Sequence, residues 1–460
     1  MNGGTMNGTT QPGATRRLAR FVTELSRDAV PEPVWHEAKR ALVDWLAATL
    51  AGAGEADTDA VCRTAARLAP GTQATVVGRR ERTTAPFAAL INGFASHLQD
   101  YDDTFNPGDT TVHGSGPVWP VVFALAELGP VTGTQALLAF VAGFEVETRV
   151  GQAAGAGHYE VGWHVTGTTG HLGAAAAAAR LLGLDELRCA YALGTSGTQA
   201  AGLKEVYGTN GKALHPGKAA MDGLLSGLLA DEGFTSATTI LEGERGFLRV
   251  LAPDPDPRLL VTELGTRWNL PANGYKAYPS GSLTHPTIDA LRELRERHPF
   301  RPSDVESVRA TVHPYAATVT GKVDPRTGLD AKFSLTHGAA VALLAARPGL
   351  THFTDAGATD PATARMRDRI AVVVDEAMSK RGARVTVTLH DGRTLRAEVA
   401  NNRGTPDNPL SDDELTAKFA DVAGPCLGTE AASALVTRCW EADRLDDFGS
   451  LVRACAQVPA

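Results

Sequence analysis

Residues 172–183 read LGAAAAAARLLG, in which six consecutive alanines, Ala174 to Ala179, are followed by a leucine pair and a glycine. Alanine has the highest helix propensity of all residues, and glycine commonly ends a helix. Because alanine side chains are small, neighbouring elements can approach such a helix closely. We therefore predict that this segment is a buried central helix with other helices packed around it.

The helical pattern extends over most of the first half of the chain. From about residue 19 to residue 252, apolar residues recur at spacings of three and four, which is typical of amphipathic helices. The clearest segments are residues 41–50, 86–97, 121–128 and 135–150. Helix is therefore expected to dominate this part of the chain.

After about residue 268 the pattern becomes mixed. Residues 305–313 alternate as a strand, and residues 384–399 read as two strands joined by a turn at Asp391-Gly392. Residues 284–298 and 334–346 are expected to be helices that cover one face of this small sheet.

Beyond residue 408 the chain returns to helix, where Ser411 and Glu414 have the spacing of a capping box. The predicted fold class is therefore mainly α with a second, smaller α+β domain. Both chain ends build a large all-helical domain, and the smaller domain is inserted into it. The expected boundaries are a flexible leader at 1–15, helical domain at 16–267, α+β domain at 268–400 and helical return at 401–460.

Composition restricts the class of protein. The 460 residues are 43% hydrophobic and 21% charged, as in ordinary globular proteins. A net charge of −8 without a basic stretch argues against nucleic acid as a partner. No run of about 18 apolar residues predicts a membrane span, and the first residues lack the apolar core of a signal peptide, so a cytoplasmic protein is expected. Five cysteines without a C-x-x-C motif are expected to be free thiols.

The densest group of polar residues is QDYDDTF at positions 99–105, with His113 eight residues further on. Its carboxylates lack the glycine and the terminal glutamate of a calcium-binding loop, so no metal is expected there. Asp100 is instead expected to orient and tune His113. A solvated acidic turn is the alternative interpretation.

Three further stretches carry groups that can bind anions or transfer protons. The loop GWHVTGTTG at 162–170 combines His164 with backbone N–H groups ahead of a helix, which favours an anion site. Lys212 lies in GTNGKALHPG at 208–217, and Lys276 and His285 lie in KAYPSGSLTH at 276–285. Taken alone, His164 could be a structural hydrogen-bonding group and Lys212 an ordinary surface lysine.

These stretches occur in order with several others, and together they resemble the MmgE/PrpD family along nearly the whole chain. The matching motifs are HLQDYDDT, GWHVTGTTGHLGAAAAAARLLGLD, KALHPGKAA, KAYPSGSLTHPTIDA, DAKFSL and NPLSDDELTAKF. The family includes 2-methylcitrate dehydratase, cis-aconitate decarboxylase and iminodisuccinate epimerase. The resemblance implies a homodimer, a lid-like small domain, and an active site at the domain junction that needs no metal or organic cofactor.

The resemblance also implies site residues. The polar positions that match the family's active-site motifs are Asp100, Thr104, His113, His164, Lys212 and Lys276. We assign His113, His164, Lys212 and Asp100 to catalysis, and Thr104, Lys276 and His285 to substrate binding. The sequence departs from the family at two points. More residues separate Thr104 from His113, with Asn106 where a His-Pro step is common, and Gly281 stands where relatives carry Cys or, in decarboxylases, His.

The chemistry expected of this site is proton transfer next to a carboxylate of a small polycarboxylate. Such a proton is weakly acidic, so its removal needs a base together with cations that stabilise the developing charge. Lys212 and Lys276 could supply the cations, and either His164 or an Asp100-oriented His113 could be the base. Dehydration of the 2-methylcitrate dehydratase type ranks first, epimerisation second and cis-aconitate decarboxylation third, because Gly281 lacks the decarboxylase histidine. A non-enzymatic binding protein ranks last.

Overall fold

The central helix of the larger part is α7 (Val165–Leu181), and its residues Ala174 to Ala179 are fully buried in the computed structural model. The neighbouring helices α6 (Gly133–Glu160) and α9 (Asn210–Asp231) approach it very closely. A Cβ atom on Gly223 of α9 would lie 2.3 Å from the Cβ of Ala174. The prediction of a buried central helix is confirmed, although the helix begins at Val165, before the alanine run.

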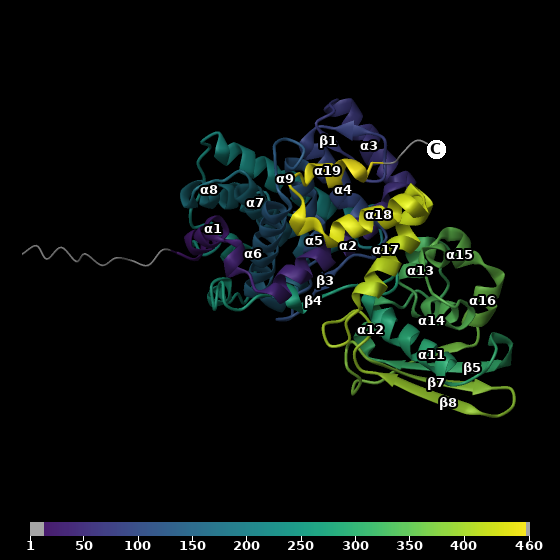
Figure 1. The fold of residues 1–460 in the computed structure, drawn as a ribbon. Helices are drawn as coiled ribbons and strands as arrows, with labels where there is room; N and C mark the ends of the chain where they lie inside the picture. The colour runs from purple at the N-terminus through teal and green to yellow at the C-terminus, as the bar shows by residue number, and fades with distance from the viewer. Residues whose placement is uncertain (1–12, 457–460) are drawn as a thin grey trace, which may run out of the picture.

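The structure describes residues 13–456, which form a large helical part and a smaller α+β part (Figure 1). The remaining helices of the larger part are α1 (Ala14–Glu24), α2 (Glu32–Ala53), α3 (Ala56–Leu68), α4 (Ala85–Leu98), α5 (Ser115–Leu125), α8 (Glu186–Gly197), α10 (Phe247–Leu251), α17 (Asp412–Leu427), α18 (Thr429–Trp440) and α19 (Gly449–Ala454). Two short strand pairs accompany them: β1 (Ala74–Thr75) with β2 (Arg82–Thr83), and β3 (Thr104–Phe105) with β4 (Asn273–Gly274).

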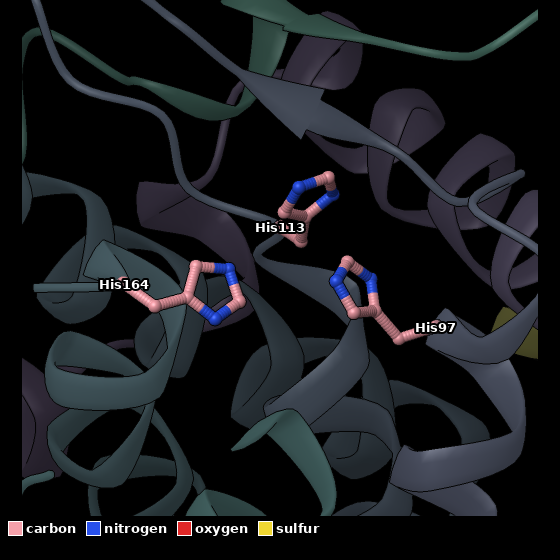
Figure 2. A group of neighbouring side chains, drawn as sticks. All are labelled: His97, His113 and His164. Atoms are coloured by element: carbon pink, nitrogen blue, oxygen red, sulfur yellow. The ribbon is translucent and has the colours of Figure 1, made fainter. Parts of the chain in front are cut away.

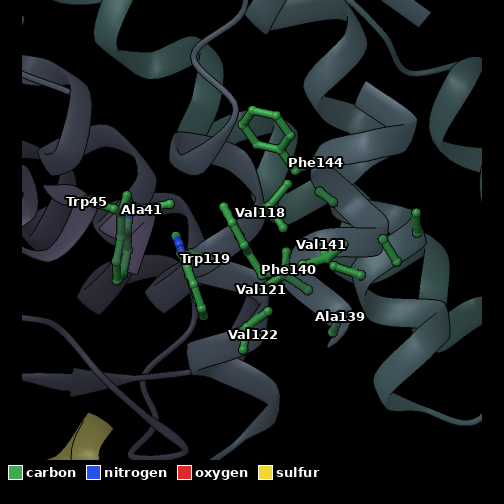
Figure 3. Packing of buried hydrophobic residues seen from close by; sticks show 14 of the residues in the cluster. Ala41, Trp45, Val118, Trp119, Val121, Val122, Ala139, Phe140, Val141 and Phe144 are labelled. Carbon is green, nitrogen blue, oxygen red and sulfur yellow. The ribbon is translucent and has the colours of Figure 1, made fainter. Parts of the chain in front are cut away.

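Aromatic side chains from distant segments meet in one core (Figure 3). Trp119 of α5 stacks on Phe140 of α6 with ring centroids 4.3 Å apart, and Trp45 of α2 meets Phe123 edge-on at 4.6 Å. Phe448, near the C-terminal end, lies 5.7 Å from Phe123 in the same core. Both halves of the helical part therefore share a single hydrophobic interior.

The chain returns to the helical part through α17, which packs against α2. The side chain of Ser411 accepts from the backbone N–H of Glu414, and the Glu414 carboxylate accepts from the backbone of Ser411. This confirms the predicted capping box. Arg40 of α2 donates to the Leu410 carbonyl at 2.6 Å and pairs with Asp412, so the start of α17 is tied to α2.

The smaller part contains a four-stranded sheet in the order β6-β5-β7-β8, formed by β6 (Ile370–Val374), β5 (Val305–Val312), β7 (Ala383–Leu389) and β8 (Thr394–Val399). β6 pairs with β5 in parallel, and the other two pairings are antiparallel. Helices α11 (His285–Arg297) and α14 (Leu335–Leu344) pack on one face of it (Figure 1). The short helices are α12 (Pro314–Val319), α13 (Gly328–Lys332), α15 (Asp355–Thr359) and α16 (Pro361–Arg367).

The predicted fold class, mainly α with a smaller α+β domain, is confirmed. The predicted leader at 1–15 lies mostly outside the described residues, and within it α1 already begins at Ala14. We retain the boundaries at 268 and 400 as a proposal. All five cysteines are free, as expected. Among residues 13–456, no helix combines the length and apolar character that crossing a bilayer requires.

Candidate active site

The acidic loop follows directly from the end of α4 and is buried rather than solvated. Asp100 is 5% exposed, and Asp102 and Asp103 are fully buried. Asp100 also has a φ of +51°, a left-handed conformation that is uncommon for residues other than glycine. Such conformations cluster at functional sites, where the surrounding contacts hold them in place.

Asp100 is held by the two predicted lysines. Its Oδ1 lies 2.7 Å from the Nζ of Lys212, and its Oδ2 lies 3.0 Å from the Nζ of Lys276. Lys276 also donates to the Asp100 carbonyl oxygen at 2.9 Å. Burial alone would raise the pKa of Asp100, but the two ammonium groups outweigh it and hold this pKa well below its usual range. The Asp100 carboxylate is therefore ionised and forms ion pairs with both lysines.

Asp100 does not orient His113, contrary to our expectation. The His113 Nδ1 donates to the backbone carbonyl of Asp103 at 2.7 Å, and the carboxylate of Asp102 lies 3.3 Å away. A carbonyl oxygen can only accept, so Nδ1 carries the proton and the neutral ring has its lone pair on Nε2. Asp102 and the Asp103 backbone are therefore the orienting groups, while Asp100 is occupied by the lysines.

His97, in the last turn of α4, completes this group and was not predicted. Its Nδ1 donates to Asp102 at 2.7 Å, and its buried Nε2 has no partner among the described residues. Burial lowers the pKa of His97 to about 3, despite the opposing effect of Asp102. Its position three residues before Asp100 is a signal that sequence reasoning could have used.

His164 immediately precedes α7 and faces the same space. Its backbone N–H donates to the Gly202 carbonyl at 2.9 Å, and its Nδ1 lies 2.8 Å from the Nδ1 of His215. Burial, followed by the charges of neighbouring groups, keeps the pKa of His164 well below its usual range. Figure 2 shows the rings of His97, His113 and His164 facing a common centre, with centroids 4.5 to 6.3 Å apart.

The stretch of residues 162–170, which we expected to be a loop, is in fact the start of a helix, and the stretch around Lys212 is another. His164 is the N-cap of α7, so the threonines that follow it are already helical. Lys212 lies in the first turn of α9. Glycine and threonine suggested loops because they have low helix propensity, but close packing in this core favours small residues and overrides that preference.

The longer connection between Thr104 and His113 forms a loop whose two ends pair through their backbones. Phe105 and Val112 pair through backbone hydrogen bonds of 2.7 and 2.9 Å, and Asn106 accepts from Thr111 at 3.3 Å. The extra residues therefore project outward and return His113 to the site. Thr104 lies 3.4 Å from the Nδ1 of His113.

The remaining predicted residues line a cleft between the two parts of the molecule. Its walls include Thr104, Asn106, Lys276, His285, Arg381 and Asn402. His285 is fully buried, and burial lowers its pKa to about 3. Lys276 and Thr104 belong to this cleft and also contact Asp100 and His113, respectively, so they connect it to the imidazole group.

Gly281 lies beside the cleft, next to Lys332 and Phe333. Its backbone N–H donates to the Lys332 carbonyl at 2.9 Å, and a Cβ atom there would meet the Phe333 ring at 3.4 Å. The side chain of Lys332 is only 7% exposed, and burial lowers its pKa. Lys332 belongs to the DAKFSL motif, but we did not predict it as a site residue.

The chain is similar to known proteins along most of its length. Residues 16–260 match the family model described as the MmgE/PrpD N-terminal domain, and residues 278–442 match the MmgE/PrpD C-terminal domain. The chain is 27% identical to the cis-aconitate decarboxylase-like protein oryM of Aspergillus oryzae, over 92% of this chain and 93% of that protein. It is 26% identical to the cis-aconitate decarboxylases of Aspergillus terreus (96% and 95% covered) and Homo sapiens (95% and 93%).

Proposed function

Because the chain belongs to the MmgE/PrpD family, we propose that it is a lyase that transfers a proton next to a carboxylate of a small polycarboxylate. The observation that carries this proposal is the 2.7 Å contact between the Nδ1 of His113 and the Asp103 carbonyl, which leaves the Nε2 lone pair without a hydrogen-bond donor among residues 13–456. A neutral imidazole held in one tautomer is suited to act as a general base.

The surrounding groups fit complementary roles. Lys212 and Lys276 supply positive charge for a carboxylate or for the enediolate-like charge that develops when the proton leaves. In the tautomer in which His164 accepts from His215, its Nε2 carries a proton that it can deliver to a leaving hydroxyl. The Nδ1 proton of His215 then moves onto the Nδ1 of His164, and the half-buried His215 is reprotonated from solvent, so His164 stays neutral. We therefore assign the base to His113 and the acid to His164.

Dehydration of a hydroxy-polycarboxylate is the reaction that we place first. It requires one group that removes a proton and a second that protonates the departing oxygen, and His113 and His164 are separate rings with centroids 6.3 Å apart. Gly281 offers no side chain to protonate a carbanion after CO₂ loss, which argues against decarboxylation at this position.

Decarboxylation is the second candidate, because the relatives described above are named cis-aconitate decarboxylases or cis-aconitate decarboxylase-like. Epimerisation would use the same proton abstraction followed by reprotonation from the opposite face. Dehydration and epimerisation both need the base that removes the proton, and they differ in where the second proton goes. Decarboxylation breaks a C–CO₂ bond instead, so it needs the cations and a group that protonates the carbanion.

The test is to incubate the purified protein in D₂O with citrate, 2-methylcitrate, cis-aconitate and iminodisuccinate. Loss of water to give an alkene supports dehydration, and CO₂ release supports decarboxylation. Deuterium uptake next to a carboxylate, with the other stereoisomer as the only product, supports epimerisation. No reaction and no exchange with any of them would contradict the proposal. Efficient itaconate formation from cis-aconitate by the native protein, not increased in Gly281→His, would reverse our ranking.

We also propose that the protein is a homodimer, as the family resemblance implies. Val161 and Leu203, on segments joined by the Trp163–Leu203 bridge, are 60% and 54% exposed and could be covered by a second copy. Sedimentation equilibrium of the full chain would check this, and a monomer mass at micromolar concentration would contradict it.

A further inference from the structure

Three histidines from separate segments of the helical part form a compact group. One ring nitrogen from each of His97, His113 and His164 lies within 4.8 Å of those of the other two, and all three residues are buried (Figure 2). They come from the end of α4, the residues before α5 and the N-cap of α7. Such a convergence of imidazoles needs a chemical explanation beyond one acid and one base.

The outer nitrogen of each ring is engaged by a second group. The Nδ1 of His97 donates to Asp102, that of His113 donates to the Asp103 carbonyl, and that of His164 lies against His215. Histidines that ligate metals have this arrangement, in which a carboxylate, a carbonyl or another polar group fixes the ring through the nitrogen that does not bind.

The inner nitrogens are then available as ligands. The Nε2 of His97 is buried and has no partner within residues 13–456. With its proton on Nδ1, His113 has a lone pair on Nε2. His164 also has a lone pair on Nε2 in the tautomer in which its Nδ1 donates to His215. An unpartnered buried polar atom is costly, and a bound ion would satisfy it.

We propose that His97, His113 and His164 bind one divalent transition-metal ion of the zinc type, and that this ion reversibly inhibits the protein. Neutral imidazoles favour zinc and similar ions over magnesium or calcium, which prefer oxygen ligands. Here Asp100 and Asp102 are occupied by lysines and histidines. Three histidines leave a fourth position open for water or a substrate carboxylate.

The geometry requires a modest adjustment. Zinc–nitrogen bonds of about 2.1 Å in a tetrahedral site separate the ligand nitrogens by roughly 3.4 Å, so the rings must approach by up to about 1.4 Å. Inhibition follows because the ion would take the Nε2 lone pair of His113 and displace the Nε2 proton with which His164 acts as the acid. The binding does not depend on the proposed reaction; only its inhibitory consequence does.

The experiment titrates the metal-free, full-length protein with Co²⁺ and then Zn²⁺, without substrate. We expect one Co²⁺ per chain, with the visible absorption of a tetrahedral site, and its displacement by Zn²⁺. His164→Gln and His97→Ala should each weaken Co²⁺ binding at least 10-fold, with folding checked by circular dichroism. His36→Ala, which removes an exposed imidazole next to Asp412, is the matched control and should bind normally.

Absence of stoichiometric binding, or binding unaffected by both triad variants, would overturn the site. Once a substrate is identified, Zn²⁺ should abolish turnover and a chelator should restore it. Full turnover by the zinc-loaded protein would overturn the inhibitory role. If no substrate reacts at all, the proposed function fails while the Co²⁺ titration still decides whether the site exists.

Discussion

A single backbone carbonyl determines what His113 can do. Because Asp103 presents its carbonyl oxygen to Nδ1, the neutral ring must place its lone pair on Nε2. The Asp103 side chain is held separately by Ser115 at 2.6 Å and Asn273 at 2.8 Å, which fixes the carbonyl in position. The reactive state of one residue is therefore set by the backbone of another.

The first prediction concerns the proposed base, His113, and one of the proposed cations, Lys212. His113→Ala and Lys212→Ala should each lower kcat/KM by about 100-fold, the scale of a lost general base or charge-stabilising group. His36→Ala, at an exposed position, should retain wild-type activity. The measurement is steady-state kinetics on the substrate identified in D₂O. Wild-type turnover in both site variants would remove these residues from the site.

The second prediction concerns pH and the buried His337 of α14. Its Nε2 donates to the His352 carbonyl at 2.8 Å, its Nδ1 accepts from Arg367 at 3.3 Å, and burial lowers its pKa to about 4. In the unfolded chain, the His337 side chain binds a proton near pH 6.5, whereas the folded protein resists this until about pH 4. The contribution of neutral His337 to the free energy of unfolding is therefore fully present above pH 6.5 and is lost as pH falls toward 4.

His337→Gln keeps a donor for the His352 carbonyl but cannot titrate. Between pH 7.5 and 5.5, urea unfolding should show a loss of stability smaller by about 1 kcal/mol in this variant than in the wild type. Equal losses in the two proteins would show that His337 does not contribute to acid destabilisation.

At the level of elements, the contact between α7 and α9 depends on missing side chains. Gly223 faces Ala174 so closely that any Cβ atom would overlap it. This close approach places Lys212, at the start of α9, near His164, at the start of α7. The small residues of both helices therefore serve the site as well as the core.

The third prediction tests this contact. Gly223→Ala should lower the free energy of unfolding by about 1–3 kcal/mol through overpacking. Gly54→Ala at the C-cap of α2 is the control, because its φ of −84° suits alanine and no other element lies within 4 Å of the added Cβ, so it should change the free energy of unfolding by less than about 1 kcal/mol. Chemical denaturation measures both, and equal effects would contradict the packing argument.

At the level of the whole molecule, Lys418 of α17 connects the parts that form the site. Its buried ammonium donates to the Asp44 carboxylate of α2 at 2.7 Å, to the Tyr101 carbonyl at 2.7 Å and to the Lys276 carbonyl at 3.0 Å. Lys418 therefore fixes the position of the acidic loop, through Tyr101, relative to the segment around Lys276 that leads into the smaller part. Lys418 is a positioning residue that does not itself face the imidazole group.

The fourth prediction separates the effect of Lys418 on stability from its effect on the position of the site residues. Lys418→Met alone should destabilise the protein by about 3–5 kcal/mol, because Asp44 is left as an unpaired buried charge. Adding Asp44→Leu should recover most of that stability but not the activity, since the carbonyls of Tyr101 and Lys276 remain unanchored. Denaturation and kinetics on both variants give the answer. Full activity in the double variant would show that Lys418 only stabilises the fold.

The sequence alone determined the helical class, the smaller sheet and hairpin, the capping box at Ser411, and the family. These features follow from local periodicity, turn residues and ordered motifs, which are properties of neighbouring residues. Strand β6 was not predicted, because the short apolar run of residues 370–374 does not by itself distinguish a strand from a piece of helix.

Only the tertiary structure decided how the polar groups are paired. Asp100 and Lys212 are 112 positions apart and meet at 2.7 Å, whereas Asp102, two residues from Asp100, turns instead to His97 and His113. Sequence could place an acidic loop beside a histidine, but it could not say which carboxylate serves the lysines and which the imidazoles. That choice depends on the left-handed backbone at Asp100 and on helices that converge from distant parts of the chain.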